Sequence, residues 1–278
     1  MSRKPQQLKS IGSLLLVGAG KMGGAMLDGW LARGLNPKKV AVIEPLPATL
    51  VKRLTRRGLK LNPKGKPAQA AAIVIAVKPQ TAPAAVPPLR SHVGKSTLVL
   101  SIMAGRTISF LEKHLPPGTA IVRAMPNTPA SIGRSITVAV ANAKVSARQR
   151  KQASDLLAAI GKVEWVGDEK LIDAVTALSG SGPAYVFLLA EALQAAGEAE
   201  GLSAEATRTL VQQTILGAAR MLIENDEAPA ELRRRVTSPG GTTQAAIETF
   251  EAGNFRDLVS RAIRAATERG KQLSAAND

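Results

Sequence analysis

The strongest constraint on this chain is a glycine-rich loop near its N-terminus, Gly18-Ala19-Gly20-Lys21-Met22-Gly23. An apolar run at residues 11–17 precedes the loop, and an amphipathic stretch at residues 22–31 follows it. This order predicts a strand, a tight turn and a helix. The first glycine permits the turn, the second lets the backbone approach a pyrophosphate, and the third lets the helix pack closely on the strand.

The context of the loop favours a dinucleotide site over a turn that serves only helix–strand packing. The start of the predicted helix offers free N–H groups and a positive dipole end to an anion. Glu44 stands 21 positions after Gly23, at the end of the next apolar run. A carboxylate at that place typically binds a ribose hydroxyl.

Composition excludes several kinds of chemistry. The 278 residues include no cysteine, which excludes disulfides, thiolate metal sites and cysteine nucleophiles. His92 follows a proline-rich segment and His114 falls in the last turn of a predicted helix, so both are expected at the surface or in a helix cap. We therefore predict no metal site and no catalytic histidine pair.

The charge is concentrated in the half of the chain that carries the glycine loop. Residues 1–167 contain 26 Lys and Arg against 5 Asp and Glu, whereas residues 168–278 contain 11 against 16. A basic domain of this kind attracts an anionic cofactor and an anionic substrate. With one Tyr, two Trp and four Phe, the chain has no aromatic platform for stacked bases, so we predict no nucleic-acid partner.

No targeting or membrane segment is expected. Residues 1–10 are polar and basic and lack the apolar core of a signal peptide. No apolar run approaches the roughly 20 residues of a membrane span. These observations predict a soluble, cytoplasmic protein that binds no membrane.

The first half alternates short apolar runs with helical patterns, which is typical of a parallel sheet covered on both faces. Strands are predicted at residues 11–17, 40–44, 73–77, 97–101, 120–124, 135–140 and 162–166. Helices are predicted between them, at residues 21–33, 47–57, 108–115 and 146–160. The fold class is therefore α/β, with a Rossmann-type doubly wound sheet.

The composition changes near Gly167 and Asp168, and from there the pattern is helical and rich in alanine. We predict a dinucleotide-binding domain at residues 1–167 and an all-α domain at residues 168–278. Helices are expected at residues 173–178, 184–200, 203–224, 231–236, 241–251 and 255–272, with a break at residues 179–183. Their broad apolar stripes predict burial against a second copy, in an obligate dimer.

Four further stretches have a composition that packing does not explain. Residues 76–80 and 124–130 each follow a predicted strand, where open α/β sheets bind their ligands. Lys78 in the first stretch is as compatible with an ordinary strand-end lysine as with a cofactor contact, and Asn127 in the second stands in a rigid turn. The glycines of residues 179–183 interrupt a helical run, and the hydroxyls and glycines of residues 236–243 are suited to bind a carboxylate at a helix start.

A chain with no cysteine, no expected catalytic histidine pair and no expected metal site suits a reaction in which a hydride donor supplies the chemistry and the protein positions the reactants. A protonated C=N is already electrophilic, so it needs less acid assistance than a ketone. A cyclic imine with a carboxylate would need a carboxylate pocket and one hydroxyl near its nitrogen. The loop at residues 236–243 offers both.

The chain resembles the pyrroline-5-carboxylate reductase family. Residues 229–251 are similar to the signature of that family over their whole length. Val77-Lys78-Pro79-Gln80, Met125-Pro126-Asn127-Thr128-Pro129 and residues 178–185 match further family motifs in the same order. The resemblance implies reduction of 1-pyrroline-5-carboxylate to L-proline with NADPH or NADH. It also implies a Rossmann domain and a helical domain that interlocks in a homodimer, which in this family often assembles into a decamer.

The resemblance also implies a role for each matching residue. Thr243 would form a hydrogen bond with the ring nitrogen or the carboxylate of the substrate. Ser238 and the backbone of Gly240, Gly241 and Thr242 would hold the carboxylate. Asn127 would lie near the nicotinamide, and the rest of the cofactor would be held by Gly18, Ala19, Gly20, Lys21, Met22, Gly23, Val77, Lys78 and Pro79.

Glu44 leaves the choice of cofactor open. The family generally favours NADPH, but a carboxylate at this position binds a ribose 2′-hydroxyl and repels a 2′-phosphate. Lys52, Arg53 and Arg56 lie nearby in the sequence and offer compensating charge. The alternatives to the main hypothesis are a reductase of a related cyclic imino acid, a β-hydroxyacid dehydrogenase-like enzyme and a non-catalytic nucleotide-sensing scaffold.

Overall fold

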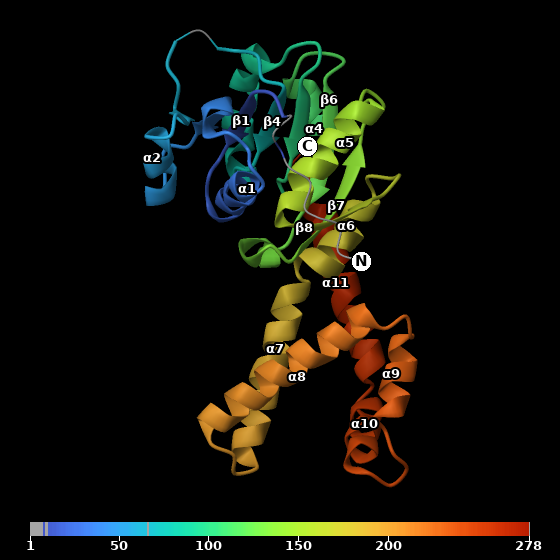
Figure 1. The fold of residues 1–278 in the computed structure, drawn as a ribbon. Helices are drawn as coiled ribbons and strands as arrows, with labels where there is room; N and C mark the ends of the chain where they lie inside the picture. The colour runs from blue at the N-terminus through green and yellow to red at the C-terminus, as the bar shows by residue number, and fades with distance from the viewer. Residues whose placement is uncertain (1–7, 9–10, 66, 278) are drawn as a thin grey trace. The chain divides into compact units, whose positions relative to one another are not determined.

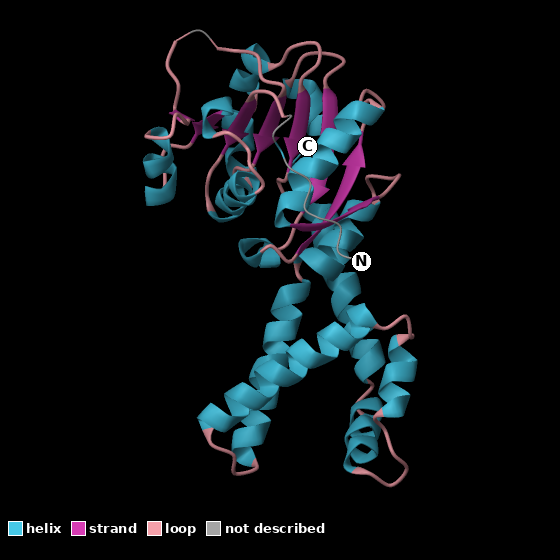
Figure 2. Ribbon diagram, in the orientation of Figure 1, coloured by secondary structure: helices cyan, strands magenta, loops and turns pink. Residues whose placement is uncertain are grey.

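The computed structural model describes residues 8, 11–65 and 67–277. Most of residues 1–10, from which we predicted that a signal peptide is absent, lie outside that part. The chain forms two compact units, Met1–Gly180 with Ala266–Asp278, and Ser181–Ala265. We predicted a boundary between a dinucleotide-binding domain and a helical domain at residues 167 and 168, which differs from the limits of the two compact units. The division of functions between the two predicted domains stays a prediction. Figure 1 and Figure 2 show the sheet in the first unit and only helices in the second.

The first unit is built on one eight-stranded sheet, in the order β3-β2-β1-β4-β5-β6-β7-β8. All seven predicted strands are present, with ends shifted by up to three residues, and β3 is an addition. The strands are β1 (Leu14–Val17), β2 (Val40–Ile43), β3 (Lys60–Leu61), β4 (Ala72–Ile75), β5 (Leu98–Ser101), β6 (Ala120–Met125), β7 (Ser135–Ala141) and β8 (Gly161–Trp165).

Alternating side chains of the strands enter two separate cores, so helices cover both faces as a doubly wound sheet requires. Leu14 and Leu16 of β1 belong to one core, together with Trp30. Leu15 and Val17 belong to the other, together with Phe110. The helices of this unit are α1 (Lys21–Ala32), α2 (Thr49–Thr55), α3 (Ala82–Ala85), α4 (Ile108–His114), α5 (Ala147–Leu157) and α6 (Leu171–Val175).

One strand pair departs from the predicted parallel sheet. Strand β7 runs antiparallel to β6, whereas the other neighbouring pairs are parallel. Only the short 3₁₀ helix Thr128–Ile132 separates β6 from β7. A parallel pair needs a crossover of about a dozen residues or more, so this connection permits only an antiparallel return.

The predicted helix break at residues 179–183 is shorter than expected. Residues Thr176–Gly180 form a π-helical turn that continues α6, and helix α7 (Gly182–Ala199) begins two residues later. A π turn keeps most backbone groups hydrogen-bonded, and Pro183 lies in the first turn of α7, where a missing N–H costs little. The glycines therefore modify the helical run without ending it.

This continuity also corrects the prediction that no stretch is long enough for a membrane. Segment Leu171–Ala199 is long and apolar enough to cross one by length and composition alone, with a mean hydropathy of 1.3 in its most apolar window. Only 11% of that window is buried within the single chain. A surface for another protein subunit has the same apolar character.

The second unit buries few side chains by itself. Its elements are α7, α8 (Ala204–Glu224), α9 (Pro229–Arg235), α10 (Thr242–Ala252) and the first part of α11 (Phe255–Asn277). Helix α7 has no buried residue, and α8 buries only Thr207 and Val211. Phe187 and Leu188 on α7 are 61% and 65% exposed. Faces this apolar favour association with another subunit.

Candidate functional site

The glycine loop has a geometry that only glycine satisfies at two of its positions. Gly18 adopts a left-handed conformation with φ of 89°, and a Cβ there would lie 2.7 Å from the carbonyl oxygen of Ala76. A Cβ on Gly23 would lie 2.1 Å from the carbonyl oxygen of Gly18. The predicted turn and close helix–strand contact are therefore both present, and they bring the loop against the end of β4.

The middle glycine differs from the other two. A Cβ on Gly20 would meet no atom within 4 Å, so the space beside this residue is open. Gly20 is the N-cap of α1, and no side chain caps that helix. The first N–H groups of α1 therefore face a space that a phosphate can enter. These observations fit the pyrophosphate of a dinucleotide.

Glu44 lies against the same loop, as its position after β2 predicts. Its Oε2 accepts a hydrogen bond of 2.8 Å from the Ala19 N–H, and its Oε1 accepts one of 3.0 Å from the Leu46 N–H. The Asn62 side chain forms two further hydrogen bonds with the backbone of Glu44. Asn62 is not among the predicted residues, although its place in a Leu-Asn-Pro triplet is a turn signal.

The strand-end segment of β4 carries three predicted cofactor residues. Val77 is half-buried against the second core, and Lys78 is exposed. The carbonyl oxygen of Pro79 accepts two hydrogen bonds from the Arg106 guanidinium, at 3.0 and 2.8 Å. Arg106 is only 5% exposed and lies over the Phe110 ring, 4.5 Å from its centroid. This buried cation fixes the segment, and it is not among the predicted site residues.

Replacing Arg106 with methionine should weaken cofactor binding about three- to tenfold, because the Pro79 segment loses its two hydrogen bonds but keeps the apolar packing. The free energy of unfolding should fall by about 1–3 kcal/mol. Fluorescence titration with NADH and urea denaturation measure the two effects. Arg90→Met, at an exposed position, is the control. An unchanged dissociation constant would show that Arg106 has no positioning role.

Asn127 has a well-defined place at the end of β6. Its side chain accepts hydrogen bonds from the Ser135 hydroxyl at 3.0 Å and the Ile136 N–H at 3.1 Å. Its Nδ2 donates to the Ser179 carbonyl oxygen in the π turn, at 3.0 Å. Asn127 thus joins the β6–β7 connection to the π turn, and its contact with a nicotinamide stays a prediction.

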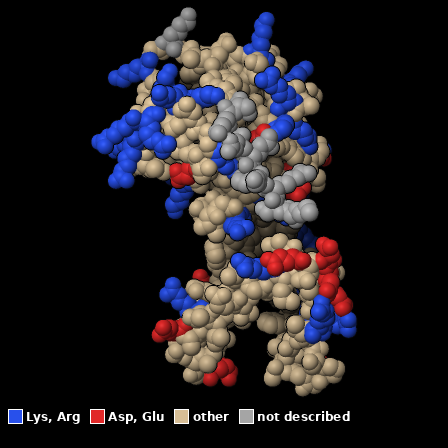
Figure 3. All heavy atoms as spheres, in the orientation of Figure 1, with Lys and Arg blue, Asp and Glu red and all other residues tan. Residues whose placement is uncertain are grey.

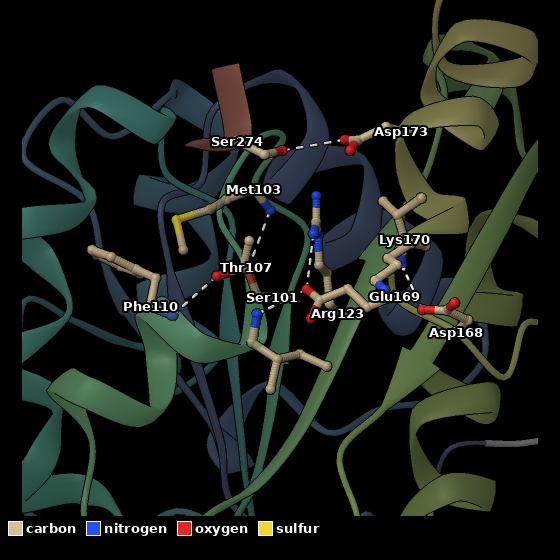
Figure 4. A network of polar contacts seen from close by, with 12 residues as sticks. Ser101, Met103, Thr107, Phe110, Arg123, Asp168, Glu169, Lys170, Asp173 and Ser274 are labelled. Carbon is tan, nitrogen blue, oxygen red and sulfur yellow. Dashed lines mark hydrogen bonds and ion pairs between the residues drawn. The ribbon is translucent and has the colours of Figure 1, made fainter. Parts of the chain in front are cut away.

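An ion pair between a buried arginine and a half-buried glutamate supports the same end of the sheet (Figure 4). Arg123 of β6 is 4% exposed and donates to Oε1 of Glu169 at 2.8 Å. The same oxygen accepts a 2.8 Å hydrogen bond from the Ile108 N–H at the start of α4. Nearby, the Ser274 hydroxyl of α11 donates to Asp173 of α6 at 3.2 Å. These contacts attach α6 and the end of α11 to the sheet unit.

The predicted carboxylate-binding loop belongs to the helical unit, between α9 and α10. Gly241 is the N-cap of α10, without a side-chain cap. The Gly241 N–H donates to the Ser238 carbonyl oxygen at 3.0 Å, and the Gly240 N–H donates to the Gln244 side chain at 2.6 Å. Within the described part of the chain, the hydroxyls of Ser238, Thr242 and Thr243 have no hydrogen-bond partner. The loop therefore presents three free hydroxyls at a helix start.

Carboxylates on both flanking helices, α9 and α10, form ion pairs with arginines. Hydrogen bonds from Arg234 hold the pKa of the Glu231 carboxyl below its ordinary value. Hydrogen bonds from Arg256 do the same for the pKa of Glu251. Both carboxyl groups are exposed, so these pairs add little stability. They neutralise two carboxylates on the helices that flank the loop.

The charge over the sheet unit has the predicted sign. Figure 3 shows many Lys and Arg side chains over this unit and few Asp and Glu.

Among the described residues, no group of three or more His, Cys, Asp and Glu side chains is placed to hold a metal ion. His114 lies in the last turn of α4, where its Nδ1 is 2.8 Å from the Phe110 carbonyl oxygen.

Comparison with known proteins gives matches over nearly the whole chain. Residues 169–273 match the family model for pyrroline-5-carboxylate reductase dimerisation, and residues 13–105 match the model for coenzyme F420-dependent NADP oxidoreductases. The pyrroline-5-carboxylate reductase of Pseudomonas aeruginosa is 42% identical over 94% of this chain and 96% of its own length. The reductase of Haemophilus influenzae is 37% identical over 94% and 97%.

Solved structures of similarly named reductases have a fold similar to that of this chain. A pyrroline-5-carboxylate reductase from Coxiella burnetii superimposes with a TM-score of 0.88 at 38% identity, covering 95% of this chain and 99% of that one. The Plasmodium falciparum pyrroline carboxylate reductase, solved with NADP bound, gives 0.83 at 30% identity, covering 96% and 99%.

Proposed function

This chain belongs to the pyrroline-5-carboxylate reductase family, and from that premise we propose that it reduces 1-pyrroline-5-carboxylate to L-proline with NADPH or NADH. The observation that carries the proposal is the set of free hydroxyls of Ser238, Thr242 and Thr243 at the start of α10. Short hydroxyl donors at an uncapped helix start suit a small carboxylate.

The cofactor is held by the sheet unit. The N–H groups at the start of α1 bind the pyrophosphate beside Gly18, Gly20 and Gly23, and Ala19, Lys21 and Met22 complete the loop. Glu44 binds the adenosine ribose, and the strand-end segment of Val77, Lys78 and Pro79 borders the cofactor. Asn127 orders the connection next to the nicotinamide. The bound reduced nicotinamide supplies the hydride, so the protein's task is to position the reactants.

The substrate is held by the helical unit. Ser238, with the backbone of Gly240, Gly241 and Thr242, binds the carboxylate, which replaces the Gln244 side chain as the acceptor of the Gly240 N–H. The Thr243 hydroxyl forms a hydrogen bond with the ring nitrogen or the carboxylate. A protonated C=N already attracts a nucleophile, so no acid of low pKa is needed. Holding the imine carbon within reach of the hydride supplies most of the rate enhancement.

The test is the loss of NADH or NADPH absorbance with 1-pyrroline-5-carboxylate, combined with detection of proline. We expect turnover with at least one cofactor. Turnover only with a larger cyclic imine carboxylate would favour the related reductase. Cofactor binding without turnover of any imine would favour a nucleotide-sensing scaffold.

We further propose that the chain acts in the cytoplasm as a homodimer, which can assemble further into a decamer. The match to a dimerisation family model and the uncovered apolar faces of the helical unit support the dimer. An apolar segment covered by a second subunit has no need of a membrane, which supports a soluble enzyme.

Replacing Leu188 with glutamate should dissociate the dimer, because a charge buried in an apolar interface costs several kcal/mol. Analytical ultracentrifugation should show the monomer at concentrations where the unaltered protein is dimeric. The control is Ile132→Glu in the sheet unit, which is 75% exposed and lies outside residues 169–273. A dimer that tolerates L188E would place the interface elsewhere.

A further inference from the structure

We propose that Glu44, held in position by Asn62, makes this protein bind NADH in preference to NADPH. The proposal rests on the proposed function in one respect, namely that a nicotinamide dinucleotide is the cofactor. It concerns the ribose of the adenosine half, which lies beyond the reacting ring. It therefore makes Glu44 a specificity-determining residue and Asn62 a positioning residue.

The Glu44 carboxylate is fixed beside the glycine loop. Its two oxygens each accept a backbone hydrogen bond, from Ala19 at 2.8 Å and from Leu46 at 3.0 Å. Ala19 stands between the first two glycines of the loop, so the negative charge lies where the adenosine end of a dinucleotide enters. A carboxylate held at both oxygens cannot swing aside without losing both bonds.

Asn62 fixes the backbone from which Glu44 projects. Its Oδ1 accepts from the Glu44 N–H at 2.8 Å, and its Nδ2 donates to the Glu44 carbonyl oxygen at 2.9 Å. The Asn62 N–H in turn donates to the Val42 carbonyl oxygen at 2.8 Å. Asn62 has a φ of 44°, a left-handed conformation that asparagine tolerates better than most residues. The side chain thus extends the pairing of β2 and β3 to the position of Glu44.

The charge of this carboxylate is not paired with a cation within the described residues, where no lysine or arginine forms an ion pair with Glu44. Lys52, Arg53 and Arg56 are exposed on and after α2. Each carboxylate oxygen has a second lone pair, so a ribose 2′-hydroxyl can still donate a hydrogen bond to it, whereas a 2′-phosphate places a second negative charge beside it.

The discriminating experiment is calorimetric titration with ADP-ribose and with 2′-phospho-ADP-ribose, which carry only the adenosine half. We expect the unaltered protein to bind ADP-ribose at least tenfold more tightly. Glu44→Gln keeps the shape and removes the charge, so it should tighten 2′-phospho-ADP-ribose binding at least tenfold. Glu164→Gln, at an exposed position of β8, makes the same change in net charge and should leave the preference unchanged.

Asn62→Gly tests the positioning role, because glycine suits the left-handed conformation while the side-chain contacts are lost. We expect the preference for ADP-ribose to fall about three- to tenfold, with the thermal unfolding midpoint as the check on folding. The ratio of kcat/KM for NADH and NADPH should follow the same order among the variants.

Three results would overturn the proposal: equal or tighter binding of 2′-phospho-ADP-ribose by the unaltered protein, an unchanged preference in E44Q, or a higher kcat/KM with NADPH than with NADH. None of these would refute the proposed reaction. Preference for ADP-ribose without turnover of 1-pyrroline-5-carboxylate would refute only the proposed reaction.

Discussion

Replacing Thr243 with alanine is expected to lower kcat by about 100- to 1,000-fold while the dissociation constant for NADH changes less than twofold. The reason is that the Thr243 hydroxyl has no hydrogen-bond partner within the described part of the protein, so it is free to act on the substrate. A single well-placed hydrogen bond to the reacting group contributes about this factor to a rate. Stopped-flow or steady-state assays with 1-pyrroline-5-carboxylate measure the loss.

Two variants make this expectation specific. Thr243→Ser keeps the hydroxyl and should recover most of the activity. Thr249→Ala removes a hydroxyl from the same helix, one that donates to the Ala245 carbonyl oxygen at 2.9 Å, and should leave kcat nearly unchanged. Full activity in T243A would contradict the role assigned to Thr243.

The second large effect is expected at Gly23. A methyl group there would lie 2.1 Å from the Gly18 carbonyl oxygen, so Gly23→Ala must push α1 away from the glycine loop. We expect cofactor affinity to fall at least 100-fold, and the free energy of unfolding to fall by about 1–3 kcal/mol. NADH titration and urea denaturation measure these changes.

Two neighbouring glycines separate folding from binding. Gly24→Ala meets nothing closer than the Ala19 carbonyl oxygen at 3.6 Å, and should stabilise α1 by up to about 1 kcal/mol with little effect on binding. Gly20→Ala meets nothing within 4 Å, so the fold should be kept while the added methyl obstructs the phosphate. Similar binding by all three variants would refute the pyrophosphate site.

The features of the site that could be predicted from sequence are those that depend on residue spacing within one segment or on the ends of neighbouring strands. The turn at Gly18 and the close packing at Gly23 follow from the spacing of the glycines within one strand–turn–helix segment. The approach of Glu44 to Ala19 also follows, because β1 and β2 are adjacent parallel strands and both residues come after strand ends.

Contacts between distant residues could not be predicted in this way. Arg106 reaches Pro79 across 27 positions, and Arg123 reaches Glu169 across 46. No local pattern distinguishes these arginines from the many exposed ones in a basic domain. The antiparallel β7 was missed because strand composition does not report direction, and the π turn was missed because two glycines usually end a helix.

The attachment of α6 and the end of α11 to the sheet unit makes the helical unit Ser181–Ala265 an insertion within another unit's chain. Its two ends are covalently joined to the same neighbour, so one proteolytic cut inside it releases no separate domain. A chain shortened before Ala266 would lose Ser274 and leave Asp173 without this partner. The nucleotide-binding unit is therefore completed only by the last turns of the polypeptide.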